Sequence, residues 1–118
     1  MPASIWRVAK FDAAAAIVPP EKLRDYLLSP LHPIGRYKLA FFQSLGYAQS
    51  QWEVLERSIR AHLETGIAEP VEVTEYGQKF AVRGVLTGPN GRSAGFVSIW
   101  IILIGESGPR FVTAYPEE

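Results

Sequence analysis

The sequence predicts an α+β domain in which three N-terminal helices pack on a four-stranded antiparallel β-meander. Apolar residues recur at helical spacing in the first half of the chain, whereas the second half consists of runs rich in β-branched and aromatic residues. Short glycine-containing turns separate these runs, as in β-hairpins. With 118 residues the chain is long enough for one domain with a buried core. We expect residues 1–19 to form an N-terminal extension and residues 20–116 to form the domain.

Three helices are predicted from the residues that start and end helical runs. The first spans about residues 20–28, with Tyr26 on its apolar side. The second spans about residues 33–45, because Pro33 is tolerated in a first turn and a glycine follows the run. The third spans about residues 51–64 and also ends at a glycine.

The predicted strands differ from the helices in period, since their side chains alternate between two faces. In the third strand, Val97 and Ile99 belong to a purely aliphatic face, whereas Phe96, Ser98 and Trp100 lie on the opposite face. We expect the aliphatic face to form the core. The four predicted strands are residues 71–74, 79–87, 93–104 and 110–115.

The composition excludes several classes of function. Twelve Lys and Arg residues balance twelve Asp and Glu residues, so a nucleic acid must be bound by a local patch rather than by bulk charge. The chain has no cysteine and two histidines, and we predict neither a metal site nor a cofactor. The lack of cysteine fits a reducing compartment, and we expect a cytoplasmic location. No apolar run approaches the roughly 20 residues of a membrane span, so no membrane association is predicted.

Lys38 is a candidate functional residue because it falls inside the apolar stripe of the second predicted helix. On a helical wheel it lies between Leu45 and Phe42. One interpretation is that its long stem passes the apolar side chains and its ammonium group reaches solvent or a carboxylate. The other is a cation held at the edge of a cleft, where it binds phosphate or stabilises a developing oxyanion.

His32 lies just before the same predicted helix. The helix N-terminus disfavours a positive charge, which would keep the imidazole neutral and able to act as a base. The alternative is a loop histidine that caps backbone groups.

A second group of candidates comes from the strands. The sheet face opposite to the aliphatic one would carry aromatic and hydroxyl groups able to stack a base and donate hydrogen bonds. Arg83 would join this face, depending on the register. The alternative is a half-exposed sheet face without a ligand, since such residues are favoured in strands for any purpose. The members of the group are Ser98, Trp100, Thr113 and Tyr115.

Six short motifs occur along the chain: K-L-x-x-Y-L-L (residues 22–28), H-P-x-G-x-x-K (32–38), the pair Phe41-Phe42, Y-G-x-K-F (76–80), G-P-N-G-R (88–92) and P-R-x-V-T-A-Y-P (109–116). Together they resemble a family of small bacterial proteins catalogued as a domain of unknown function. The resemblance covers about residues 20–116.

The order of elements is also similar, more distantly, to the ribonuclease toxin domains grouped with barnase, colicin D and RelE. These have helices before a four-stranded antiparallel sheet. This resemblance implies attack of an RNA 2′-hydroxyl on the adjacent phosphate, with a base, an acid and cations but no metal. It implies the following roles: His32 as base or acid, Lys38 with Arg83 or Arg110 as phosphate-binding cations, and Thr113 with Tyr115 as orienting hydroxyls.

Two hypotheses of different classes follow. The chain is a toxin-like, metal-independent endoribonuclease that cuts RNA and has a small cognate antitoxin or immunity protein as its partner. Alternatively, it is a non-catalytic protein-interaction module, either the partner or immunity half of such a pair or an adaptor that uses the aromatic sheet face.

Overall fold

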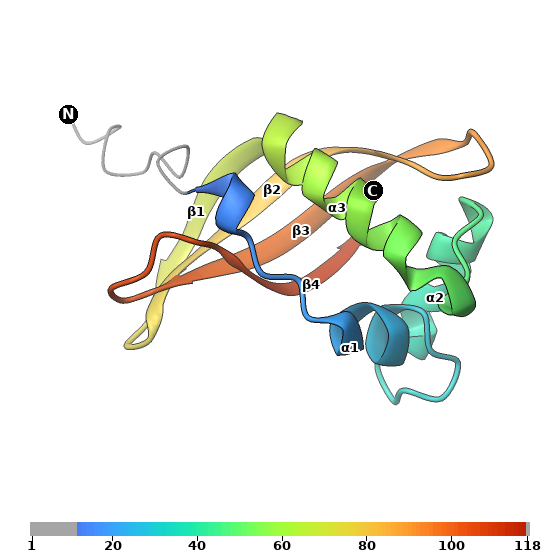
Figure 1. Cartoon of the computed structure of the whole chain (residues 1–118), viewed down its shortest axis with the longest axis horizontal. Helices are drawn as coiled ribbons and strands as arrows, with labels where there is room; N and C mark the ends of the chain where they lie inside the picture. Colours follow the sequence, from blue (N-terminus) through green and yellow to red (C-terminus); the bar gives the residue numbers. More distant parts are fainter. Residues whose placement is uncertain (1–11, 118) are drawn as a thin grey trace.

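The computed structural model describes residues 12–117 and contains the predicted four-stranded antiparallel meander. The strands follow one another in the sheet in chain order, so β1 and β4 are its two edges (Figure 1). Residues 1–11 of the predicted N-terminal extension lie outside the described residues. The strands are β1 (Ile67–Val73), β2 (Gly77–Thr87), β3 (Ser93–Leu103) and β4 (Arg110–Pro116).

The helical elements differ strongly in length and form. α1 (Pro20–Lys22) is a single turn that continues directly into a π-helical turn, Leu23–Leu27. α2 (Arg36–Ser44) and α3 (Trp52–Thr65) are regular α-helices. Two short 3₁₀ turns, Ala13–Ala15 and Gln49–Gln51, precede α1 and α3.

The prediction of three N-terminal helices packed on the sheet is therefore wrong. α3 lies along the sheet and contacts β2, whereas α1 and the π-helical turn sit beside the edge strand β4, and α2 packs on the π-helical turn (Figure 1). The first predicted helix spans only eight residues, of which five are π-helical. Eight residues are too few for the spacing of apolar residues to distinguish α from π geometry.

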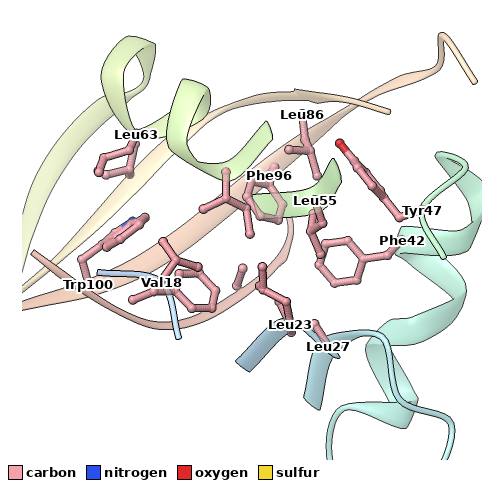
Figure 2. Packing of buried hydrophobic residues seen from close by; sticks show 14 of the residues in the cluster. Val18, Leu23, Leu27, Phe42, Tyr47, Leu55, Leu63, Leu86, Phe96 and Trp100 are labelled. Carbon is pink, nitrogen blue, oxygen red and sulfur yellow. The ribbon is translucent and has the colours of Figure 1, made fainter. Parts of the chain in front are cut away.

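The core lies between α3 and one face of the sheet, and it extends toward α2 and the π-helical turn (Figure 2). α3 contributes Leu55, Ile59 and Leu63, which are almost completely buried. Phe42 of α2 packs edge-on against Phe96 of β3, with ring centroids 6.0 Å apart. α2 thus reaches the sheet through its aromatic side chains while its backbone rests on the π-helical turn.

The prediction that the aliphatic face of β3 forms the core is also wrong. Phe96, Ser98 and Trp100 are fully buried in the core, whereas Ile99 on the other face is only half-buried. Both faces of this strand are apolar, so alternation alone does not identify the inner one. The large aromatic rings fill the space beneath α3 and bury more area than aliphatic side chains would.

The segment before α1 covers the outer edge of β4. Ile17 forms a parallel bridge with Arg110: its amide donates to the Pro109 carbonyl at 2.9 Å, and its carbonyl accepts from the Phe111 amide at 2.9 Å. Val18 follows and is 4% exposed, within the core. This contact occupies backbone groups of an edge strand that would otherwise be free to pair with another chain. Among residues 12–117, no helix combines the length and apolarity needed to span a bilayer.

A small polar cluster lies inside the core. The Nε2 of His62 is 3.1 Å from the Val82 carbonyl and 3.0 Å from Ser98 Oγ, which also accepts from Trp100 Nε1 at 2.7 Å. The carbonyl can only accept, so Nε2 carries the ring proton. His62 Nδ1 is buried, and no hydrogen-bond partner for it occurs among the described residues. Burial lowers the pKa of His62 below its ordinary value, against the weaker opposing effect of the Val82 carbonyl.

We expect His62 to make the fold sensitive to mild acid. Because its pKa is lowered in the folded state, its contribution to stability is present above the ordinary value of 6.5 and is lost as the pH falls below it. The free energy of unfolding of the parent chain should fall between pH 6.5 and 5, by at most about 1.4 kcal/mol per pH unit from this group. Urea unfolding of parent and His62→Gln across this range measures it. Equal pH slopes in the two proteins would contradict the assignment.

Candidate functional site

A groove of about 570 Å³ opens beside β4, where the π-helical turn and the turn before α2 meet the edge of the sheet. Two neighbouring segments, residues 21–26 and 32–34, and the distant residues 112–113 contribute its walls, so the groove exists only in the folded chain. The lining includes a lysine, a histidine, two carboxylates and a tyrosine. The lining residues are Glu21, Lys22, Asp25, Tyr26, His32, Ile34, Val112 and Thr113.

Three polar side chains meet at the wall of this groove. Lys38 Nζ donates to Tyr26 Oη and to Thr113 Oγ1, at 2.9 Å each, and the two hydroxyl groups are 2.8 Å apart and share a hydrogen bond. We call this arrangement the Tyr26–Lys38–Thr113 triangle. Lys38 does not itself line the groove, but the two hydroxyl groups to which it donates belong to residues that do. No described carboxylate forms an ion pair with its ammonium group.

Irregular backbone brings the members of the triangle together. The π-helical turn, marked by the 2.9 Å bond from the Leu28 amide to the Leu23 carbonyl, carries Tyr26. A β-bulge in β4 leaves Val112 outside the register between Phe111 and Thr113. Such bulges and π turns re-aim side chains and are frequent near functional sites.

The turn before α2 is shaped by His32. Its Nδ1 accepts from the amides of Ile34 and Gly35, at 3.0 Å each. A nitrogen that accepts carries no proton, so the neutral ring has its proton on Nε2 and presents a donor there. The ring meets the Tyr26 ring edge-on, with centroids 4.8 Å apart. His32 thus caps backbone groups, as one interpretation expected, and also lines the groove.

Gly35 is required by a close approach of two backbone segments. A Cβ atom at this position would overlap the carbonyl oxygen of Tyr26. The glycine of H-P-x-G-x-x-K therefore lets the turn before α2 press against the π-helical turn, while His32 holds the turn and Lys38 reaches Tyr26. The motif is thus explained as one structural unit.

The electrostatics of the groove act on the pKa of Tyr26. Burial acts to raise the pKa of Tyr26, but hydrogen bonds from Lys38 and Thr113, together with the positive charges of Lys38 and Lys22, outweigh it. The pKa of Tyr26 therefore lies below its ordinary value. Lys38 Nζ is 5.3 Å from the ring centroid and Lys22 Nζ is 6.0 Å from it.

Lys22 brings a positive charge to the groove surface. Its Nζ donates to the Val112 carbonyl at 3.1 Å, and it is not ion-paired with any described carboxylate. Of the two carboxylates in the groove, Asp25 is bound by Arg24 at 2.9 Å, whereas Glu21 is exposed and forms no ion pair with a described residue. A groove that presents the Lys22 ammonium group, an imidazole donor and a tyrosine of lowered pKa, itself hydrogen-bonded by Lys38, can bind an anion and transfer a proton beside it.

The other predicted site residues lie elsewhere. Arg83 sits on the sheet face away from α3 and pairs with Glu69 and Glu117, and Arg110 pairs with Glu106 at 3.1 Å. Tyr115 is 39% exposed and is not among the described residues that line the groove.

Ser98 and Trp100 are fully buried in the core cluster with His62, so neither side chain is accessible to an RNA base at the surface. The structure brings together Lys38, Thr113 and His32 and does not bring the remaining candidates to them.

Sequence analysis missed Tyr26 and Lys22 as site residues. Both belong to the K-L-x-x-Y-L-L motif, in which Tyr26 was assigned to an apolar helical side and Lys22 was not singled out. The available signal was the phenol group itself, because a buried tyrosine hydroxyl needs a polar partner.

Comparisons with known proteins give a family and a similar solved structure. A family model described as "Domain of unknown function (DUF6883)" matches residues 10–118, which confirms the expected relation to a family of unknown function. No curated protein sequence matches the chain. Among solved structures, a chain of the "Contact-dependent growth inhibition toxin - immunity protein complex from Klebsiella pneumoniae 342" is similar with a TM-score of 0.68 and 21% identity, over 90% of this chain and 97% of that chain. At this identity the similarity shows a shared fold.

Gly35→Ala should destabilise the protein, because the added methyl group must displace the Tyr26 backbone. We expect a loss of about 1–3 kcal/mol in the free energy of unfolding, as for other overpacked sites. Urea denaturation measures it. Gly95→Ala is the matched control, since its Cβ would meet the Glu117 side chain at an ordinary 3.4 Å. Equal stabilities of the two variants would disprove the close approach.

Lys38→Met should raise the pKa of Tyr26, because it removes a hydrogen bond and a positive charge that lower this pKa and leaves the opposing effect of burial in place. Carbon-13 NMR titration of labelled tyrosine rings measures this pKa, and Tyr26→Phe identifies the signal. Lys79→Met, which removes a half-buried lysine on β2, should leave the Tyr26 titration unchanged. An unchanged pKa in Lys38→Met would show that the lysine does not tune the phenol.

Proposed function

The chain belongs to the DUF6883 family of domains of unknown function, and we propose that it is the toxin half of a bacterial toxin–immunity pair and acts as a metal-independent endoribonuclease. The observation that carries the proposal is the Tyr26–Lys38–Thr113 triangle, which lowers the pKa of a tyrosine at the wall of a groove. The shared fold with a chain of a toxin–immunity complex supports the same class of system. The site of action would be the cytoplasm, and the partner would be a cognate immunity protein.

The chemistry proposed is attack of an RNA 2′-hydroxyl on the adjacent phosphorus. Tyr26, as phenolate, takes the proton of the 2′-hydroxyl while the oxygen–phosphorus bond forms. The bond from phosphorus to the 5′-oxygen breaks, and Lys22 gives a proton to that oxygen. The products are a 2′,3′-cyclic phosphate and a free 5′-hydroxyl, and the proposed reaction uses no metal ion.

The remaining groups stabilise charge or hold others in place. His32 Nε2–H donates a hydrogen bond to a non-bridging phosphate oxygen, which gains charge in the transition state. Lys38 is a positioning residue: it acts through Tyr26, whose phenolate its ammonium group stabilises. Thr113 accepts from Lys38 and bonds the phenol, so it orients both.

A second candidate function is a non-catalytic interaction module, such as the immunity half of a pair. It is favoured by one observation, the sheet face that α3 does not cover. On that face Ile67, which pairs with Arg83, is 72% exposed. Val85, two residues after Arg83 on β2, is 63% exposed. Apolar side chains in this position suit contact with another protein.

Expression of the chain alone in a bacterium should arrest growth, and the purified protein should cut RNA in the presence of EDTA. Tyr26→Phe should slow cleavage by about 10²–10⁴-fold, the range for loss of an acid–base group. Lys38→Met should shift the rise of the pH–rate profile to higher pH, because the pKa of the base is raised. Lys79→Met is the control and should cut as the parent does.

Normal growth with intact RNA on expression of the parent chain would contradict the nuclease and favour the interaction module. A Lys38→Met enzyme that is slower but has the parent's pH profile would assign this lysine a structural role alone.

A further inference from the structure

An exposed ridge adjoins the groove in the turn that leads into α2. Its apolar members are Leu31, Ile34 and Tyr37, which are 87%, 58% and 75% exposed. Arg36 lies beside them and is exposed as well. We call these residues the 31–37 ridge. Ile34 also lines the groove, so the ridge and the groove form one continuous surface.

The aromatic ring of the ridge is held in place by its neighbour. Arg36 Nη2 donates to Tyr37 Oη at 2.9 Å, and the guanidinium carbon lies 4.9 Å from the ring centroid. Arg36 forms no ion pair with a described carboxylate. The ridge therefore presents an oriented aromatic ring together with an uncompensated positive charge.

Charge is distributed unevenly along the chain, and the basic residues outnumber the acidic ones in the part of the sequence that contains the ridge. Residues 21–52 carry four basic and two acidic side chains, and no acidic residue occurs between positions 26 and 52. Residues 53–118 carry six basic and nine acidic side chains. A chain with no net charge thus has a basic region, and this region contains the ridge and two of the three groove segments.

We propose that the 31–37 ridge is a subsite for single-stranded RNA. Tyr37 stacks on the base of a nucleotide next to the phosphate in the groove, Ile34 packs against the sugar or base edge, and Arg36 contacts the adjoining phosphate. Bases in a duplex have both faces stacked and cannot reach such a ring, so the strand must be single. The inference deepens the proposed nuclease function and rests on it for the nature of the ligand.

The positive charge decides between RNA and a protein partner as the occupant. A protein that docked on the apolar side chains alone would gain nothing from Arg36 on the ridge or from Lys22 in the groove, neither of which forms an ion pair with a described carboxylate. A polyanion with planar bases uses both features of the surface.

Fluorescence anisotropy with a labelled single-stranded RNA tests the subsite. The RNA is 2′-O-methylated throughout, so it binds but offers no nucleophile for cleavage. Tyr37→Ala should weaken binding by roughly 5- to 100-fold, the effect of removing one stacking platform. Tyr37→Phe, which keeps the ring, should retain most of the affinity. Tyr76→Ala removes a tyrosine that is 66% exposed in the β1–β2 turn, at the opposite end of the sheet from α2 (Figure 1), and should bind as the parent does.

The outcomes separate the subsite from the nuclease. Parent-like affinity of Tyr37→Ala, or no binding by the parent chain, overturns the subsite, and in the first case the ridge is a surface for a protein instead. A parent chain that binds the methylated RNA through Tyr37 but leaves unmodified RNA uncut overturns the nuclease and supports the subsite. An equal loss of affinity in Tyr76→Ala also overturns the subsite, because the effect of Tyr37→Ala would then not be local.

Discussion

The Tyr26–Lys38–Thr113 triangle ties the helical part of the molecule to the edge of the sheet. A lysine ammonium group only donates, so it needs acceptors, and a half-buried cation without hydrogen bonds is costly. The acceptors come from the π-helical turn and from β4, and both elements are irregular at that point. Gly35 allows the turn before α2 to approach closely enough for Lys38 to reach them. The lowered pKa of Tyr26 depends on this set of contacts, which also joins α2 to the π-helical turn and to β4.

Much of the fold could be predicted from local sequence patterns, and the predictions that failed have a common physical cause. The strands and their meander were predictable because glycine-containing turns interrupt β-branched runs. α3 was predictable because its apolar stripe, with Leu55 and Ile59, is long enough to show a helical period. The π form of the first helical segment was not, since its eight residues are too few to show a period. The inner face of β3 was not, because Phe96 and Ile99 are both apolar, and only the volume beneath α3 decides which of them is buried.

A site residue could be predicted from the sequence where its charge conflicted with its place in an apolar helical stripe. Lys38 stood out because a cation lay in an apolar stripe, and the structure shows its head group held by two hydroxyls. Tyr26 lay in a similar stripe, but an aromatic side chain is common in such a stripe, so Tyr26 was interpreted as an apolar helix residue. Ser98 and Trp100 were misplaced together with the sheet face. The bulge that aims Thr113 at Lys38 has no signal in a single sequence, because it depends on the register with β3.

The two polar clusters of the molecule show why chemistry is assigned to the groove. The cluster of His62, Ser98 and Trp100 is neutral and fully enclosed, and burial keeps the histidine uncharged. It fixes how α3 sits on the sheet, and a substrate has no access to it. The triangle around Lys38 carries a positive charge that no described carboxylate balances, and it opens on a groove large enough for a ligand. An unbalanced charge at an accessible wall lowers the free energy of a bound anion more than it stabilises the empty fold, which is the property that a binding site requires.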